Sequence, residues 1–184
     1  MSFGMAHQIG VGRTTHICPP SSGIVNSFRY VRFSLGRSDK NAGSYLNQLQ
    51  VIDTDGVNRA LGRHEYLTPA GTEIWASYPL KEAFNGSIVS NKTWGLGYHK
   101  KTHILDLGSS YVLSEVRMYP YYADGRTFQD VGIEISNDQE TWYLIHDSEA
   151  DGTTSLYHGR QAGTAEGLVF DISAALVFLQ GIAP

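Results

Sequence analysis

The segment "YVLSEVRMYPYYADGRTFQDVGIEISNDQETW", residues 111–142, contains two alternating apolar stretches with an aromatic and charged loop between them. In the second stretch Val131, Ile133 and Ile135 are apolar, and the residues between them are not. An apolar period of two is typical of a strand with one buried face. We therefore expect two regular strands here, which hold the loop 120–127 between them.

The same strand pattern recurs along the chain, and a sustained helical period does not. Asn137 and Asp138 tolerate left-handed backbone, so they predict a hairpin turn after the second strand. The pattern gives about seven strands and little helix, and an antiparallel β-sandwich is the natural way to bury them. The further stretches of strand length are residues 28–36, 46–51, 102–108, 141–147 and 168–172.

Two segments differ from this strand pattern. Residues 1–27 are rich in Gly, Ser, Thr and Pro and show no period, so we expect an N-terminal arm or linker, followed by one β-sandwich domain over residues 28–184. Residues 59–101 are mostly irregular, and a stretch of that length inside a domain is usually functional or decorates one end of the fold.

Charge and targeting signals restrict the classes of function and location. The net charge of -4 argues against a nucleic-acid binder, which is normally basic. Cys18 is the only cysteine, the first residues lack a secretory signal pattern, and the apolar tail at 174–184 is too short to span a bilayer. We therefore expect assembly in a cytoplasm and no insertion into a membrane.

Motifs for catalysis are missing from the sequence. It has no G-x-S-x-G elbow, no H-E-x-x-H helix and no Cys/His cluster at zinc spacing. His99 and His103 are four residues apart, but they lie in a loop that leads into a strand and not on one helix face. We therefore expect a protein that is not an enzyme.

Several short motifs in the sequence resemble those of a known protein family. "THILDLGSSYVLSEVRMYP" followed by "FQDVGIEISNDQETW" resembles the discoidin family, also called coagulation-factor type C or galactose-binding-like domains. Asn58–Gly62 and "EAFNG" at 82–86 add to a resemblance that covers residues 28 to about 173. It implies an eight-stranded jelly-roll sandwich with ligand loops at one end, commonly beside a structural calcium.

The family's calcium site is altered in this sequence. The resemblance places Asn85 and Gln48 where the family has acidic residues. Calcium affinity rises with the number of carboxylates, so two amides predict a degenerate, weakened or lost metal site. The alternative is that Asn85 and Gln48 hydrogen-bond to each other across the same gap.

The candidate ligand site combines two loops that lie at one end of the sandwich in sugar-binding members of the family. Aromatic faces and a few placed polar groups are the usual means of binding neutral sugars. By resemblance, Arg126 matches a ligand arginine. Two alternatives stay open: Arg126 could pair with Asp124 or Asp130, and Trp94 could plug the core, where we also expect Trp142. The candidate residues are Trp94, Tyr98, His99, Tyr121, Tyr122, Asp124 and Arg126.

The sequence thus predicts a non-catalytic carbohydrate-binding attachment module, with surface glycan or polysaccharide as its partner. The arm and the small sandwich suit a phage virion component such as a tail, fibre or head-spike protein, held to other virion proteins by residues 1–27 and forming a homo-oligomer. One alternative is a structural virion protein that uses the sandwich as a packing block. Another is an accessory domain of a glycan-degrading enzyme.

Overall fold

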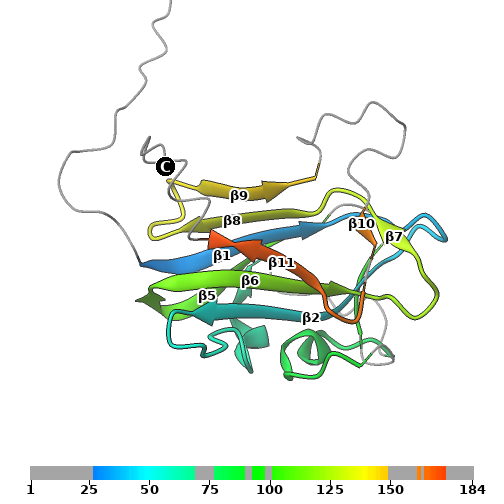
Figure 1. Ribbon diagram of the computed structural model, residues 1–184, viewed down its shortest axis with the longest axis horizontal. Helices are drawn as coiled ribbons and strands as arrows, with labels where there is room; N and C mark the ends of the chain where they lie inside the picture. Colours follow the sequence, from blue (N-terminus) through cyan, green and yellow to red (C-terminus); the bar gives the residue numbers. More distant parts are fainter. Residues whose placement is uncertain are drawn as a thin grey trace, which may run out of the picture.

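The part of the chain that the structure describes forms eleven strands and two short 3-10 helices (Figure 1). The computed structural model describes residues 27–68, 77–89, 93–97, 101–148, 161–162 and 164–172. The helices are η1 (Arg63–Tyr66) and η2 (Leu80–Phe84). The strands are β1 (Phe28–Leu35), β2 (Ser44–Asp53), β3 (Leu67–Thr68), β4 (Trp94–Gly97), β5 (Lys101–Tyr111), β6 (Leu113–Pro120), β7 (Thr127–Phe128), β8 (Gly132–Ser136), β9 (Tyr143–Asp147), β10 (Gln161–Ala162) and β11 (Leu168–Asp171).

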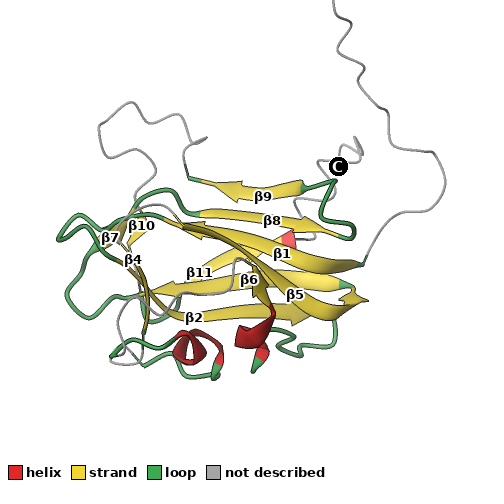
Figure 2. Cartoon of the chain, turned by 180° about the vertical axis from the view of Figure 1, so that it is seen from behind, coloured by secondary structure: helices red, strands yellow, loops and turns green. Residues whose placement is uncertain are grey.

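Two antiparallel sheets form the sandwich. The five-stranded sheet has the order β3-β5-β1-β8-β9, and the four-stranded sheet has the order β11-β6-β2-β4. A small third sheet pairs β10 with β7. Figure 2 shows β1, β8 and β9 side by side, with the two short helices on the β2 side of the molecule. These sheets confirm the predicted antiparallel β-sandwich with little helix.

The core lies between the inner faces of the two sheets, as the alternation of the strands requires. On β1, Val31 is paired with Leu105 and Ile135, so three apolar side chains form one row across the sheet. Leu49 is paired with Met118 in the other sheet. All five side chains are fully buried, and each contributes about 1.5–3 kcal/mol relative to exposure.

Eight of the strands have four or more residues, and the remaining three have two. All seven predicted strand regions are present. The long irregular segment between residues 59 and 101 contains both 3-10 helices and the short strands β3 and β4. Cys18 and nearly all of the predicted arm lie outside the described residues, as does the apolar tail at 174–184.

Trp142 corrects one expectation about the core. Its ring is partly exposed and lies under the guanidinium of Arg32, 4.1 Å from the ring centroid, on the outer side of the five-stranded sheet. The indole Nε1 donates to the carbonyl oxygen of Gln139 at 2.9 Å. The ring follows the hairpin turn directly, and its own turn carbonyl and a neighbouring arginine hold it outside the sandwich.

The direction of β1 defines the two ends of the sandwich. The strand starts at Phe28 and ends at Leu35, where the chain enters the loop 36–43 that leads to β2. On one side of the sandwich, the ring of His146 on β9 stacks on Phe170 of β11 with centroids 4.6 Å apart, so the two sheet edges meet there. Within the described part of the chain, no helix has the length and apolar character needed to cross a membrane.

Candidate functional site

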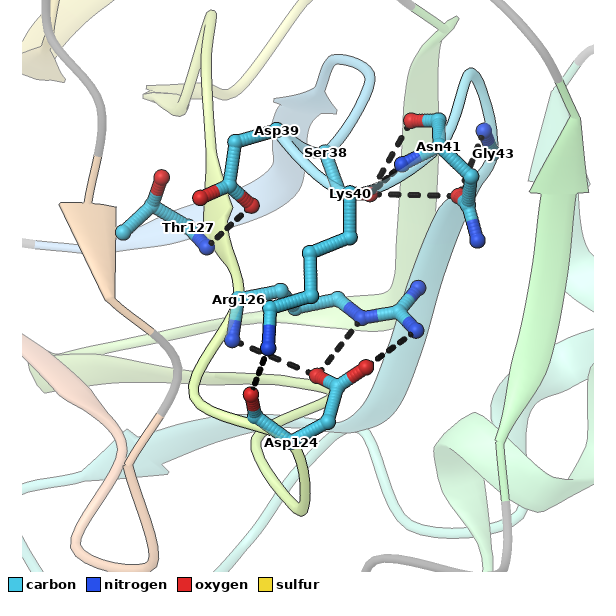
Figure 3. Close-up of polar contacts among 8 residues, drawn as sticks. All are labelled: Ser38, Asp39, Lys40, Asn41, Gly43, Asp124, Arg126 and Thr127. Carbon is cyan, nitrogen blue, oxygen red and sulfur yellow. Dashed lines mark hydrogen bonds and ion pairs between the residues drawn. The ribbon is translucent and has the colours of Figure 1, made fainter.

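The candidate site forms where two loops from different sheets lie together at the Leu35 end of β1. The loop 36–43 joins β1 to β2, and the loop 121–126 joins β6 to β7. Asp39 Oδ1 accepts a hydrogen bond from the backbone N–H of Thr127 at 2.9 Å, and the Lys40 ammonium donates to the carbonyl oxygen of Asp124 (Figure 3). These contacts fix the aromatic loop against its neighbour, although more than 80 residues separate the two along the chain.

A tight turn shapes the tip of the 121–126 loop. The backbone N–H of Gly125 donates to the carbonyl oxygen of Tyr122 at 3.1 Å, and Gly125 has a φ of 68°. Asp124 Oδ1 accepts the backbone N–H of Arg126 at 3.2 Å. An aspartate that bonds to the backbone two residues on is a usual turn former, and glycine supplies the positive φ without steric cost.

Arg126 and Asp124 are joined by a bidentate ion pair. Arg126 Nε donates to Asp124 Oδ1 at 2.9 Å, and Nη2 donates to Oδ2 at 2.7 Å. The hydrogen bonds from the guanidinium lower the pKa of Asp124 to about 2, with smaller contributions from the charges of Arg126 and Lys40. The sequence left Asp124 and Asp130 open as partners of Arg126, and the structure selects Asp124.

Tyrosine rings surround the Arg126 guanidinium. It lies 4.8 Å from the ring centroid of Tyr121 and 5.2 Å from that of Tyr45. Tyr45 in turn meets Tyr78 edge to face at 5.6 Å. Arg126 is 9% exposed, and its Nη1 is buried without a hydrogen-bond partner within the described part of the chain. The arginine thus acts as a support under the tyrosines more than as an exposed ligand group.

The outer rim of this end of the sandwich is aromatic and apolar. The Tyr122 hydroxyl donates to the carbonyl oxygen of Ile88 at 3.1 Å, which links the loop to the segment 77–89. Tyr78, Ile88 and Val89 are exposed, by 39%, 37% and 50%. Exposed Tyr78 and half-buried Tyr122 beside charged side chains are suited to binding a partner that has both apolar and hydroxyl surfaces.

The structure brings together four of the seven predicted ligand residues, namely Tyr121, Tyr122, Asp124 and Arg126. Tyr98 and His99 lie outside the described residues. Trp94 is 1% exposed and packs in the core with its ring 4.9 Å from that of His103. Trp94 was expected either to stack on a ligand or to plug the core, and its burial corrects the first alternative. β4 pairs with β2 and thereby turns the indole inward.

The two amides predicted for a degenerate metal site are in different environments. Gln48 is fully buried on β2, where its Nε2 donates to the Leu49 carbonyl at 3.2 Å. Asn85 is exposed; its Nδ2 donates to Glu82 at 2.7 Å, and its Oδ1 accepts the N–H of Ser87 at 2.7 Å. No hydrogen bond between Asn85 and Gln48 is formed among the described residues.

Metal ligation has no further candidates in the described ranges. These contain no group of three or more His, Cys, Asp or Glu side chains placed to hold a metal ion. The polar groups of the site are the Asp124–Arg126 ion pair, Asp39, Lys40 and the tyrosine hydroxyls, which can bind hydroxyl groups but do not form a nucleophile and base pair. The arrangement is therefore chemically suited to binding.

Sequence reasoning missed Lys40, Tyr45 and Tyr78. Lys40 lies in the turn-forming stretch "GRSDKNAG", residues 36–43, between the first two strands. Since alternate connections in an antiparallel sandwich lie at the same end, that stretch could have been assigned to the end that carries the 120–127 loop. Tyr45 at the start of β2 and Tyr78 just before η2 give no such signal, because the sequence around neither tyrosine separates a surface ring from a core ring.

No family model, curated protein or solved structure matches the chain.

Proposed function

We propose that the chain is a non-catalytic carbohydrate-binding module whose sugar-contacting surface is the tyrosine rim around Arg126. The observation that carries this proposal is the cluster of Tyr45 and Tyr121 about a buried guanidinium, with exposed Tyr78 against Tyr45 and half-buried Tyr122 beside Tyr121. The flat faces of such rings pack against the C–H surfaces of sugar rings, and nearby polar groups meet the hydroxyls.

Each side chain has a distinct part in this proposal. Tyr122 and Tyr78 present aromatic surface to the sugar, while Lys40 and the exposed side of Asp124 face its hydroxyls. Arg126 holds the tyrosines of the rim in position, because its Nε and Nη2 already donate to Asp124 and the residue is only 9% exposed. This assignment differs from the role implied by the family resemblance, in which the arginine contacts the sugar.

The biological setting follows from the resemblance to discoidin domains and from the composition of residues 1–27. In this proposal the chain is a phage virion component, assembled in the host cytoplasm, that contacts surface glycans of the host. The N-terminal arm holds it to other virion proteins. Several copies in a homo-oligomer would compensate for the weak binding of one shallow site, since linked sites act at a high effective concentration.

The experiment is a glycan array that includes bacterial surface polysaccharides, probed with and without EDTA. Wild-type protein, Tyr122→Ala, Tyr122→Phe and Val169→Ala are compared; Val169 is 54% exposed on β11 and serves as the control. We expect Tyr122→Ala to lose binding, and Tyr122→Phe and Val169→Ala to keep it. Equal binding of Tyr122→Ala and wild type would exclude this rim as the sugar site.

A packing role in a larger particle is the second candidate. It is favoured by the exposed apolar side chains Ile88 and Val89 beside Tyr122, which suit a protein partner as well as they suit a sugar. Light scattering on a sizing column separates the two functions. An oligomer that Val89→Arg disperses, together with no binding on the array, would support the packing role.

A further inference from the structure

The outer face of the five-stranded sheet carries a hollow that is separate from the loop end. Its volume is about 450 Å³, within the range of ligand sites in proteins. It is lined by Arg32, Phe33, Ser34, Thr102, Gly132, Glu134, Leu144, His146 and Asp147, which come from β1, β5, β8 and β9. These strands are neighbours in the sheet (Figure 2).

Small residues on the central strands produce the hollow. Ser34 and Gly132 are paired across β1 and β8, and Ser34 pairs with Thr102 on β5. A Cβ atom on Gly132 would lie 2.7 Å from Ser34 Oγ, so any other residue here would have to displace that hydroxyl. The Ser34 hydroxyl donates to the carbonyl oxygen of Asp130 at 2.8 Å. Small residues therefore form the bottom of the hollow, and larger side chains surround it.

A held ion pair forms one wall. Arg32 Nε and Nη2 each lie 2.5 Å from a carboxylate oxygen of Glu134, and the guanidinium lies over the ring of Trp142. A bidentate pair has planar geometry and donors and acceptors in fixed positions. Leu144, which is 48% exposed, supplies apolar surface on β9. One wall can thus meet hydroxyl groups and the other can meet C–H surface.

A second, smaller hollow continues the same face. Its volume is about 200 Å³, and it is lined by Tyr30, Glu65, Tyr66, Thr68, Ile104, Asp106 and Gln139. Tyr30 and Arg32 are successive outward residues of β1, about 7 Å apart at two residues of rise, so the two hollows follow each other along that strand. Tyr66 is 53% exposed and offers an aromatic face. Such a row of sites fits a linear polymer.

The charges on this face indicate which polymer. The carboxylates of Glu134 and Asp106 are paired with Arg32 and Arg29. Glu65 and Asp147 also line the two hollows, so the face has no excess of positive charge to attract a phosphate or sulfate polymer.

We propose that the outer face of the five-stranded sheet is a second binding site, which takes a segment of a neutral polysaccharide chain. Sugar rings lie along β1 from Ser34 to Tyr30, contact Leu144 and Tyr66 by their C–H surfaces, and hydrogen-bond to the Arg32–Glu134 pair. This site is independent of the tyrosine rim, and either can exist without the other.

The test is native gel electrophoresis of the full chain through gels that contain mixed-linkage β-glucan, galactomannan or dextran. The polymers are neutral and stay in place, while a chain of net charge -4 migrates. The blocking variant is Thr102→Trp, which fills the hollow from an exposed position. Its matched control is Ser109→Trp, an exposed serine on the same strand and outside both hollows.

We expect at least one polymer to retard the wild type, and Thr102→Trp to lower the apparent affinity by about tenfold or more. Ser109→Trp and the rim variant Tyr122→Ala should migrate like the wild type. Leu144→Ala is a second test variant in case Thr102→Trp folds poorly. It removes an exposed wall residue without filling the space and should also weaken retardation. The proposal is overturned if no neutral polymer retards the wild type, if Thr102→Trp matches Ser109→Trp, or if Tyr122→Ala alone abolishes retardation.

Discussion

Asp124 and Arg126 are bonded through both oxygens of the carboxylate and two nitrogens of the guanidinium, across a single glycine. Because the pKa of Asp124 is about 2 in the folded chain, below its ordinary value of 3.8, the ionised carboxylate favours the folded state above about pH 4. That contribution should fade as the pH falls from about 4 toward 2. Urea unfolding at several pH values should give Asp124→Asn a lower free energy of unfolding than the wild type at pH 7. The difference between the two should shrink at low pH.

The reciprocal variant checks the cause of this low pKa. In Arg126→Gln the hydrogen bonds that lower the pKa are lost, so the Asp124 carboxyl should titrate close to the ordinary aspartate value of about 3.9. The side-chain carbon shift of Asp124 by NMR measures it directly. A titration midpoint still near 2 in Arg126→Gln would show that the backbone turn, and not the guanidinium, holds the carboxylate.

Arg126 should resist replacement by lysine. An ammonium group makes no bidentate pair and does not lie flat between Tyr45 and Tyr121, so we expect Arg126→Lys to lower the free energy of unfolding by about 1–2 kcal/mol. Arg37→Lys is the control, since Arg37 is exposed in the neighbouring loop. Equal stability of the two lysine variants would contradict the supporting role of Arg126.

Trp94 should behave as a core residue. Removal of a buried aromatic ring costs about 3–5 kcal/mol, so Trp94→Ala should be strongly destabilised, and Trp94→Phe less so. Sugar binding by Trp94→Phe should match that of the wild type at a temperature where both are folded. A variant that keeps its stability but loses sugar binding would restore Trp94 to the ligand site.

Calcium should have little effect on this chain. Asn85 Oδ1 already accepts the N–H of Ser87, and the described residues hold no group of three or more His, Cys, Asp or Glu side chains placed to hold a metal ion. Because a ligand that binds only the folded state raises the melting temperature, thermal unfolding in millimolar calcium and in EDTA should give the same midpoint. A rise in calcium that Asn85→Ala removes would establish a metal site.

Gly108 tests how tightly β5 is packed against η1. It has a φ of 81°, and a Cβ there would lie 2.4 Å from Arg63 Nη1, whereas Gly56 has a φ of 77° and open space around it. Both alanine variants carry the cost of left-handed backbone, about 1–2 kcal/mol, and only Gly108→Ala must also displace the arginine. In chemical unfolding, Gly108→Ala should therefore have a lower free energy of unfolding than Gly56→Ala.

The alternation of apolar residues was sufficient to predict the strands, but it did not predict what packs against their outer faces. Val31 and Ile133 lie inward as their alternation predicts, because a half-buried strand fixes the side of every residue it contains. Gln48 follows the same alternation to the outer face and is nonetheless fully buried, because η2 packs against β2. No sequence period records which loop will cover an outer face.

Turn and site details depended on specific hydrogen bonds that the apolar pattern does not indicate. The left-handed residue of the hairpin is Gln139, with a φ of 64°, and not Asn137 or Asp138. Asp138 instead accepts the N–H groups of Glu140 and Thr141, which shifts the turn by one residue. In the same way, the aromatic loop could be chosen from the sequence as a candidate site, but its anchoring by Lys40 could not.

The position of β1 has a mechanical consequence. The strand is hydrogen-bonded on both sides, to β5 and β8, and it runs from Phe28 at one end of the sandwich to the loop that holds the tyrosine rim at the other. The bonds of antiparallel pairs are perpendicular to the strands, so tension between Phe28 and a ligand held at the rim loads both ladders in shear, all bonds together, and not one after another. A domain held at Phe28 and bound to a surface at its far end should withstand more force than one whose strands are separated one hydrogen bond at a time. Single-molecule pulling in the two geometries would measure the difference.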